Sequence, residues 1–323
     1  MSEKKIATRD SYGAALVEFA GDDKDIIVLD ADLAAATKTG MFKKAYPERF
    51  IDCGIAECDL MGVAAGLATT GKKVFASSFA MFAAGRAFEI IRNSIGYPHL
   101  KVNICATHAG ISVGEDGATH QCCEDIALMR TIPGMTIINP SDDVETKAAI
   151  KALLNYDGPA YVRLGRLAVP VLNENHDYKF EIGKGIELKS GKDVTIVATG
   201  LMVYMALEAA EELKKDGIDA RVINIHTIKP LDKDIIIKAA KETGLLVTVE
   251  EHNIIGGLGG AVSETVCEEC PVKVVKIGVN DTFGMSGPAP ELLKKYGLST
   301  ENIIATVKKA ISSKLESIIN DKN

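Results

Sequence analysis

The sequence predicts an α/β protein with two domains, each built on a mainly parallel sheet flanked by helices. Short runs rich in β-branched residues alternate with helix-like runs, and this alternation is typical of parallel strands joined by covering helices. It stops near residue 166 and restarts near residue 193. The chain has 323 residues, of which 47% are hydrophobic, so it can bury two cores at roughly 100 to 200 residues per domain.

Five strands are predicted in the first domain, each a short apolar run bounded by turn residues. They are residues 25–30, 73–78, 101–107, 135–140 and 160–164. A helix of small residues is predicted from about residue 60 until Gly71 ends it. Another helix is predicted after "NPSDD", where Ser141 or Asp142 can cap it and Glu145 fits a capping box.

The second domain repeats the alternation after a break. Residues 167–192 are rich in Gly, Asn, Lys and Pro, so we expect a linker there, between a first domain at 1–166 and a second at 193–323. The strands expected in the second domain are residues 193–200, 220–226, 245–252 and 272–279. Its helices are expected near 202–215, 232–243 and 258–268, and from about Ser299 onward.

Charge and hydropathy exclude several classes of protein. The chain has 37 basic and 44 acidic side chains, a net charge of −7, and no basic stripe, which argues against a nucleic-acid partner. The N-terminal residues lack the apolar region of a signal peptide, and no apolar run reaches the ~18 residues that a membrane helix needs. We therefore expect no membrane association and a cytoplasmic location.

The seven cysteines are an odd number spread through apolar runs, which favours reduced thiols. Cys267 and Cys270 form one C-x-x-C pair, but a structural zinc site needs four ligands and no second pair has matching spacing. We therefore expect no metal ligands in this chain. Cys122 and Cys123 directly follow the segment that ends at Gln121, and His120 could serve as their basic partner, so thiol catalysis remains an alternative.

The segment "THAGISVGEDGATHQ", residues 107–121, concentrates the polar chemistry of the chain. It leaves the carboxyl end of a predicted parallel strand, where ligands of such sheets gather. His108, Asp116 and His120 supply two bases and a carboxylate, on a backbone that its glycines make adaptable. These three residues are therefore candidate site residues.

Two further segments carry candidate residues. In "GIAE", Glu57 stands at the entrance to the small-residue helix, where burial favours a strongly hydrogen-bonded carboxyl. A simple first-turn role at the helix N-terminus is its alternative interpretation. In "SSFAMF", Phe79 and Phe82 are three residues apart and predicted on one helical face, a pattern that by itself is more typical of a core.

Taken together, the segments "ATRDSYGAAL", "GIAE", "SSFAMF", "GEDGATHQ" and "YVRLGR" make the sequence resemble the C-terminal half of a transketolase, a thiamine-diphosphate enzyme. The resemblance covers nearly the whole chain. It implies a pyrimidine-binding first domain and a Rossmann-like C-terminal domain. The half of the family that binds the diphosphate and Mg²⁺ or Ca²⁺ has no counterpart here. The resemblance thus implies an N-terminal partner subunit. Two copies of this chain would form a homodimeric core, and two partners would complete a heterotetramer.

The resemblance also implies roles for the cofactor-binding residues. Glu57 would be a catalytic residue that hydrogen-bonds the pyrimidine nitrogen of thiamine, while Phe79 and Phe82 would flank the ring. Asp32 falls on a family position that lines this site. Gly85 stands where the family usually has a third aromatic residue, so part of the ring pocket must be filled differently.

The sugar-binding residues follow from the same resemblance. His108, Asp116 and His120 would hold the sugar substrate, with both histidines counted as catalytic. Arg166 and Arg9 would bind the sugar phosphate, a task that suits the planar guanidinium. Where the family often has a serine at the phosphate, this chain has Ala36 beside Thr37.

The predicted function is transfer of a two-carbon ketol unit from a ketose phosphate such as xylulose 5-phosphate to an aldose phosphate, a reaction of the pentose phosphate pathway. Half of a deoxyxylulose-phosphate synthase and the beta subunit of a 2-oxo acid dehydrogenase are alternatives, although His108 and Glu115 favour transketolase. A more distant alternative is a non-catalytic nucleotide-binding module, prompted by the glycines of "EEHNIIGGLGGAV", residues 250–262. Their spacing is not that of a dinucleotide site, and a tight strand-to-helix turn is the expected explanation.

Overall fold

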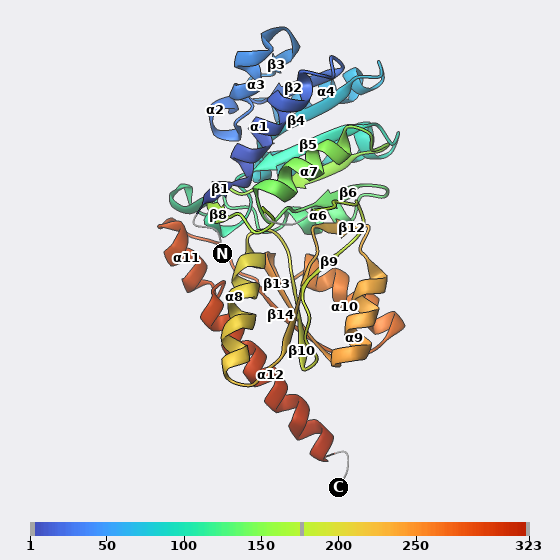
Figure 1. Cartoon of the computed structure of the whole chain (residues 1–323). Helices are drawn as coiled ribbons and strands as arrows, with labels where there is room; N and C mark the ends of the chain where they lie inside the picture. The colour runs from blue at the N-terminus through green and yellow to red at the C-terminus, as the bar shows by residue number, and fades with distance from the viewer. Residues whose placement is uncertain (1–3, 175–177, 321–323) are drawn as a thin grey trace.

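A computed structural model describes residues 4–174 and 178–320 of the chain. Figure 1 shows two α/β domains joined end to end, with the C-terminal helix extending beyond the second. The predicted fold class is confirmed. Each domain has a mainly parallel sheet covered by helices on both faces.

The first domain is built on a seven-stranded sheet in the order β12-β6-β7-β5-β4-β2-β3. All five predicted strands of this domain are present. They are β2 (Ile26–Asp30), β4 (Lys73–Phe79), β5 (Val102–Thr107), β6 (Thr136–Ile138) and β7 (Ala160–Arg163). A short strand at one edge, β3 (Phe50–Asp52), pairs in parallel with β2 and was not predicted.

Helical segments cover both faces of this sheet. The longer α-helices are α1 (Thr8–Ala20), α4 (Glu57–Ala68) and α7 (Asp143–Leu153). The shorter segments are α2 (Ala34–Thr37), α3 (Gly40–Ala45), η1 (Pro47–Arg49), η2 (Met81–Arg86), α5 (Phe88–Ile90), η3 (Ile91–Gly96), η4 (Ile111–Asp116) and α6 (Asp125–Arg130). The small-residue helix therefore begins at Glu57, three residues earlier than predicted.

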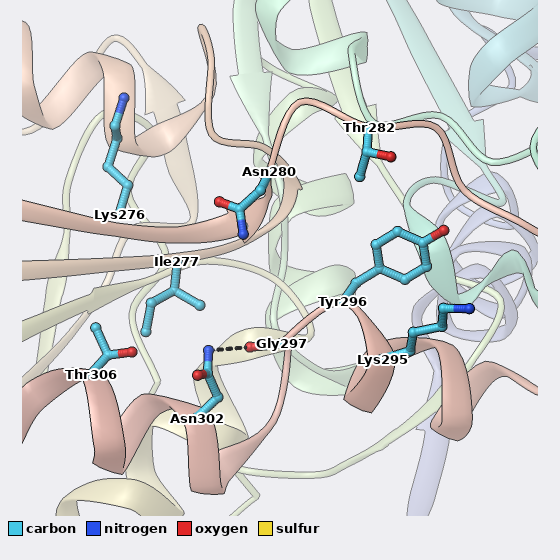
Figure 2. A pocket seen from close by; sticks show the side chains of 10 residues that line it. Lys276, Ile277, Asn280, Thr282, Lys295, Tyr296, Gly297, Asn302 and Thr306 are labelled. Carbon is cyan, nitrogen blue, oxygen red and sulfur yellow. Dashed lines mark hydrogen bonds between the residues drawn. The ribbon is translucent and has the colours of Figure 1, made fainter.

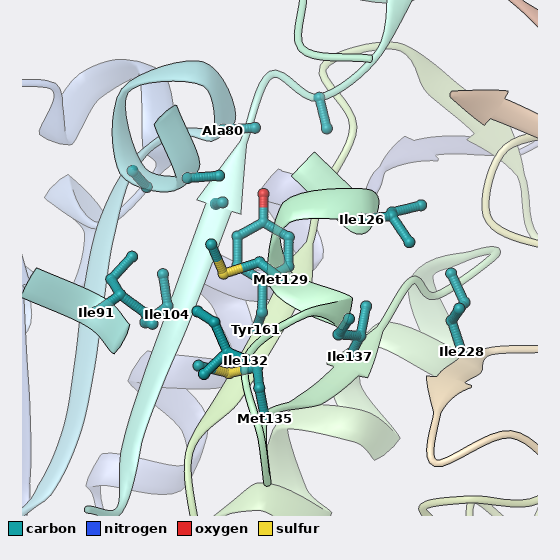
Figure 3. Close-up of a cluster of buried hydrophobic side chains, with 14 of the residues drawn as sticks. Ala80, Ile91, Ile104, Ile126, Met129, Ile132, Met135, Ile137, Tyr161 and Ile228 are labelled. Carbon is teal, nitrogen blue, oxygen red and sulfur yellow. The ribbon is translucent and has the colours of Figure 1, made fainter. Parts of the chain in front are cut away.

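Strand residues alternate between two buried clusters. Ile104 and Tyr161 face one cluster, while Cys105 and Val162, their neighbours in the chain, face the other. This alternation follows from the two-residue period of a strand and explains why the predicted strands are apolar throughout. Figure 3 shows the first cluster, where Ile104 and Tyr161 lie beside Met129.

The second domain has a five-stranded sheet in the order β14-β13-β10-β11-β9. Its strands are β9 (Ile186–Lys189), β10 (Val194–Ala198), β11 (Ala220–Asn224), β13 (Leu245–Asn253) and β14 (Lys273–Val279). Its helices are α8 (Met202–Lys215), α9 (Lys233–Thr243), α10 (Leu258–Glu269), α11 (Ala289–Lys295) and α12 (Thr300–Asn320). The four predicted strands and four predicted helices are thus present, and β9 adds an antiparallel edge.

The two domains share backbone pairing at their junction. Strand β12 (Thr227–Lys229) lies beyond the predicted boundary, yet it pairs antiparallel with β6 of the first sheet. Strand β8 (Ala168–Pro170) pairs antiparallel with β1 (Lys5–Ala7). The segment predicted as a linker therefore contributes β8 and β9, which its turn-rich composition concealed.

The predicted helical placement of Phe79 is wrong. Phe79 is the last residue of β4, which stays paired with β5 as far as Phe79 and Thr107. The helical segment η2 begins only at Met81 and carries Phe82. The three-residue spacing therefore spans a strand end and a helix start, and it still brings the two rings within 5.8 Å between centroids.

The predicted helix cap at Asp142 is confirmed, and Glu145 completes a variant of the capping box in which it binds the residue before the cap. The Asp142 carboxylate accepts a hydrogen bond from the backbone N–H of Glu145 at 2.8 Å. Its second oxygen accepts from the N–H groups of Leu172 and Asn173 at 2.7 and 2.9 Å. The Glu145 carboxylate accepts in turn from the N–H of Ser141 at 2.6 Å. One buried carboxylate thus caps a helix and anchors the start of the interdomain segment.

We predict that Asp142→Ala lowers the free energy of unfolding by about 2–4 kcal/mol, because a helix cap is lost and two backbone N–H groups lose their acceptor. Chemical denaturation measures this change. Asp143→Ala is the matched control, since Asp143 forms a partly exposed ion pair with Lys147 and should cost less than ~1 kcal/mol. Equal destabilisation by both substitutions would contradict the role given to Asp142.

Candidate functional site

Four rings gather at the carboxyl ends of β4 and β5. The rings of Phe79 and His108 are stacked with centroids 3.9 Å apart, and Phe82 meets His120 edge-on at 5.2 Å. Phe79 lies 6.2 Å from His120, which closes the group. The fold thus joins "SSFAMF" to "THAGISVGEDGATHQ", two segments that the sequence separates by about 25 residues.

His108 is the most constrained member of this cluster. It is buried, and its backbone is left-handed with φ 57°. Its Nε2 lies 3.0 Å from Nη1 of Arg9, and its Nδ1 lies 2.9 Å from Oγ1 of Thr107. An arginine can only donate, so Nε2 is the acceptor and Nδ1–H donates to Thr107. Burial, followed by the charges of Arg9 and Arg166, lowers the pKa of His108 to about 3, so the ring is neutral near pH 7.

Two arginines make the surroundings of His108 electropositive. Arg9 also donates from Nη1 to the carbonyl of Ala36 at 3.1 Å, and burial lowers its pKa. Arg166 donates from Nη1 to the carbonyl of Val113 and to Glu115 Oε2, the latter at 3.1 Å. The Glu115 carboxylate therefore occupies part of the guanidinium that would bind an anion. An incoming phosphate can compete for this arginine, because Glu115 is exposed.

Glu57 is buried in the first turn of α4, with 5% of its surface exposed. A carboxylate is favoured at a helix N-terminus by the helix dipole, so the simple first-turn role also fits. Its Oε2 lies 3.9 Å from Nε of Arg86, at the end of η2, the segment that carries Phe82. Glu57 is therefore positioned against the same helical segment as one ring of the cluster.

The remaining predicted residues are more open. Asp116 is exposed at the end of η4, and His120 is half-buried, with its Nδ1 2.9 Å from Oγ1 of Thr119. Asp32 is exposed just after β2, and its backbone N–H donates to Asp52 at 3.0 Å. Among the described residues, no hydrogen bond or ion pair joins the Asp32 or Asp116 side chains to the ring cluster. The Asp32 and Asp116 carboxylates therefore lie outside the contacts that hold the ring cluster together.

Sequence reasoning missed several residues that shape this region. Thr107 accepts the Nδ1–H of His108, and Lys38 adds a positive charge that helps to lower the pKa of His108. Gln121 is buried and donates from Nε2 to three backbone carbonyls, including Ile111 at 3.3 Å and Gly114 at 3.2 Å. The "THQ" motif could have identified Gln121 as a site residue. No motif in the sequence around Lys38 indicates a role for that lysine.

The alternative chemistries find little support. Cys122 and Cys123 are buried, and burial raises the pKa of both thiols, which disfavours the nucleophilic thiolate. No cluster of three or more metal-binding side chains occurs among the residues that the structure describes. The glycines after β13 form a turn into α10, whose first N–H groups, at Leu258 and Gly259, donate to Glu250 at 2.6 and 2.7 Å. A nucleotide phosphate would have to displace that carboxylate.

A hollow of about 580 Å³ lies in the second domain, away from the ring cluster. Figure 2 shows it between the end of β14 and the helices α11 and α12, with Asn280, Tyr296 and Asn302 on its walls. The Nδ2 of Asn302 already donates to the carbonyl of Gly297 at 2.7 Å, and Nζ of Lys276 donates to Ile254 at 3.0 Å. None of the predicted site residues lines this hollow.

No helix in the described ranges is both long and apolar enough to cross a membrane.

Comparison with known proteins identifies the family of both domains. The family model of the transketolase pyrimidine-binding domain matches residues 4–171, and that of the transketolase C-terminal domain matches residues 183–303. A relative from Methanocaldococcus jannaschii, whose name includes "transketolase C-terminal section", is 54% identical over 91% of this chain and 93% of that protein. The 6-deoxy-6-sulfo-D-fructose transketolase subunit SqwH of Clostridium sp. is 44% identical over 92% of each.

A solved structure titled "Split gene transketolase, inactive beta4 tetramer" has a TM-score of 0.89 and 55% identity, covering 95% of this chain and 99% of that chain. Mouse transketolase is 40% identical over 94% of this chain, which spans only 49% of that longer protein. The matched domains together cover most of the sequence. The chain therefore belongs to the transketolase family of thiamine-diphosphate enzymes.

Proposed function

We propose that this chain is the C-terminal subunit of a two-chain cytoplasmic transketolase. It moves a two-carbon ketol unit from a ketose phosphate, such as xylulose 5-phosphate, to an aldose phosphate, such as ribose 5-phosphate. Residues 1–166 form the pyrimidine-binding domain and residues 193–323 the C-terminal domain. The observation that carries the proposal is the cluster of Phe79, Phe82, His108 and His120 beside two arginines.

The residues present fit the pyrimidine half of thiamine diphosphate. Phe82 is half-buried and offers a ring face for stacking, Phe79 supports it from 5.8 Å between centroids, and Glu57 offers a buried carboxyl next to η2. Thiamine diphosphate supplies the capacity to stabilise a carbanion. This chain supplies orientation: Glu57 holds a pyrimidine nitrogen by a hydrogen bond, and the phenyl rings fix the plane of the pyrimidine. Asp32 completes the edge of this site.

The polar residues suit a phosphorylated sugar. His108 is neutral, and its Nε2 would accept a hydrogen bond from a sugar hydroxyl that replaces Arg9 there, while Nδ1–H stays bonded to Thr107. His120 and Asp116 lie on the same loop, where they reach the remaining hydroxyls. Arg9 and Arg166 bind the phosphate, and Arg166 exchanges its Glu115 partner for it.

A partner subunit is part of the proposal because the diphosphate and metal site of the family lies outside these residues. Mg²⁺ or Ca²⁺ would be held there by oxygen ligands. The face of α4 offers a surface for subunit contact. Gly62 and Gly66 on α4 have nothing within 4 Å of an added Cβ, and Ile55, just before α4, is 82% exposed. Two copies meeting on this face, with two N-terminal partners, would make a heterotetramer.

Two sugar donors fit the charge of the site. The relative named for 6-deoxy-6-sulfo-D-fructose suggests a second donor to include in assays. Sulfonate and phosphate are both anions that arginine can bind, so Arg9 and Arg166 fit either one. An assay of ketol transfer from both donors tests the reaction class. Parallel assays of deoxyxylulose-phosphate synthesis and 2-oxo acid decarboxylation test the two alternative enzymes. Turnover of neither ketose by the reconstituted enzyme would reject the proposal.

We predict that Glu57→Gln keeps the fold but reduces kcat of the reconstituted enzyme by at least about 100-fold, because an amide cannot exchange the proton that a carboxyl can. Steady-state kinetics at saturating cofactor measure the effect. Glu18→Gln is the matched control, since Glu18 is an exposed carboxylate near the end of α1. More than a few per cent of wild-type kcat in Glu57→Gln would contradict this role.

We predict that Arg166→Ala raises KM for phosphorylated donors by about one to two orders of magnitude, the ~1.5–3 kcal/mol of a charge-assisted hydrogen bond. KM for an unphosphorylated donor such as hydroxypyruvate should change much less. Arg92→Ala, which removes an exposed arginine bonded to Asn93, serves as the control. Equal losses for both kinds of donor would show that Arg166 does not bind phosphate.

We predict that the isolated chain lacks ketol-transfer activity and binds thiamine diphosphate weakly, because it supplies only the pyrimidine side of the cofactor site. Activity and calorimetric cofactor binding should both appear on mixing with an N-terminal transketolase subunit. The control is the same mixture with the Glu57→Gln chain, which should assemble without turnover. Robust activity of this chain by itself would overturn the two-chain proposal.

A further inference from the structure

The backbone of the loop formed by residues 107–121 is irregular. His108, Gly110, Gly114 and Gly117 have φ values of 57°, 81°, 85° and 75°, all in the left-handed region. Its own backbone bonds close short turns, such as Gly117 N–H to Gly114 at 3.1 Å, and they join no two distant parts of the loop. Because three proposed sugar-binding residues lie on this loop, its neighbours must hold it in place.

Glu251 of the second domain is one of these neighbours. It lies near the end of β13, and its buried carboxylate accepts a hydrogen bond from the backbone N–H of Ser112 at 2.6 Å. A Cβ added at Gly110 would lie 2.4 Å from Cδ of Glu251. The loop backbone therefore passes directly over this carboxylate, and only glycine permits that approach.

The position of Glu251 is fixed by Arg163 at the end of β7. Arg163 donates from Nη2 to the backbone carbonyls of Glu251 and Cys122, at 2.9 and 3.2 Å. Its Nε donates to the buried carboxylate of Asp125 at 2.8 Å. The same guanidinium thus ties β13 of the second domain to the residue that follows the loop.

Two more contacts from the second domain meet the same loop. Ser286 donates from Oγ to the carbonyl of Glu115 at 2.6 Å. Gln121, at the end of the loop, donates from Nε2 to the carbonyl of Met285 at 2.9 Å. The second domain therefore holds the loop at Ser112, Glu115 and Gln121, which are on both sides of Asp116.

We propose that Glu251 is a positioning residue for sugar binding: it fixes the loop through the N–H of Ser112 so that His108, Asp116 and His120 meet the substrate together. It touches neither sugar nor cofactor. This inference rests on the proposed function and assigns the C-terminal domain a part in it. Glu57, Phe79 and Phe82 belong to α4, β4 and η2, so this contact reaches the proposed cofactor residues only through the packing of His108 and His120 on the two phenyl rings. Sugar binding should therefore depend on it more than cofactor binding does.

The test compares three substitutions of Glu251 with a control at the preceding residue. Glu251→Ala removes the acceptor, and Glu251→Asp retracts the carboxylate by one methylene while keeping its charge. Glu251→Gln keeps an oxygen acceptor at nearly the same place. Glu250→Ala is the control, because Glu250 is equally buried in β13 but accepts from Leu258 and Gly259 of α10 and not from the loop.

In the enzyme reconstituted with its partner, Glu251→Ala and Glu251→Asp should lower kcat/KM for the sugar by about 10- to 100-fold, as expected when reacting groups are misplaced. The Kd for thiamine diphosphate should stay within about two-fold of wild type, a split that general destabilisation would not produce. Glu251→Gln should recover most of the loss. The inference fails if sugar and cofactor binding weaken equally, if Gln is as impaired as Ala, or if neither Ala nor Asp has an effect.

Hydrogen exchange of the full chain gives a readout that needs no activity. The amide of Ser112 should exchange at least about ten-fold faster in Glu251→Ala and Glu251→Asp, and at the wild-type rate in Glu250→Ala. Unchanged exchange at Ser112 would overturn the inference. If wild-type chain and partner show no ketol transfer, the proposed function fails, while this exchange measurement still decides whether Glu251 holds the loop.

Discussion

The ion pair between Arg163 and Asp125 is the interaction on which the arrangement of the site depends. Both side chains are almost fully buried, and the Tyr161 hydroxyl donates to the same Asp125 oxygen at 2.8 Å. Removing one partner of such a pair typically costs about 3–5 kcal/mol, because an unpaired charge stays buried. Since Arg163 also binds backbone carbonyls from both domains, its network joins the sheet of the first domain, the loop and strand β13.

This network explains how a loop with left-handed residues can carry chemistry. Loops usually place functional groups with less precision than strands or helices do. Here the loop starts from β5, is fastened by Glu251 and Gln121, and ends beside Arg163. The flexibility that its glycines provide is thus removed by buried hydrogen bonds. The second domain, which contributes no ring to the cluster, acts on the site by holding this loop.

The electrostatics of the site favour an anionic ligand. Arg9 and Arg166 lie near a histidine that is neutral because it is buried beside them, so positive charge is concentrated without a competing imidazolium. The carboxylate nearest to Arg166 is Glu115, an exposed side chain that can move aside. An anionic ligand would therefore meet two guanidinium groups beside a neutral histidine.

The sequence alone determined both sheets' central strands, the helix cap at Asp142 and the two segments whose rings meet in the cluster, because each depends on local periodicity or on a short motif. It did not reveal β9, β12 or the strand position of Phe79, because edge pairing and strand length are set by contacts with segments distant in the chain. It gave no signal for Glu251, an acidic residue in an apolar strand. Only the tertiary structure decided that this carboxylate meets Ser112, 139 residues away, since such a bond depends on how the two domains pack.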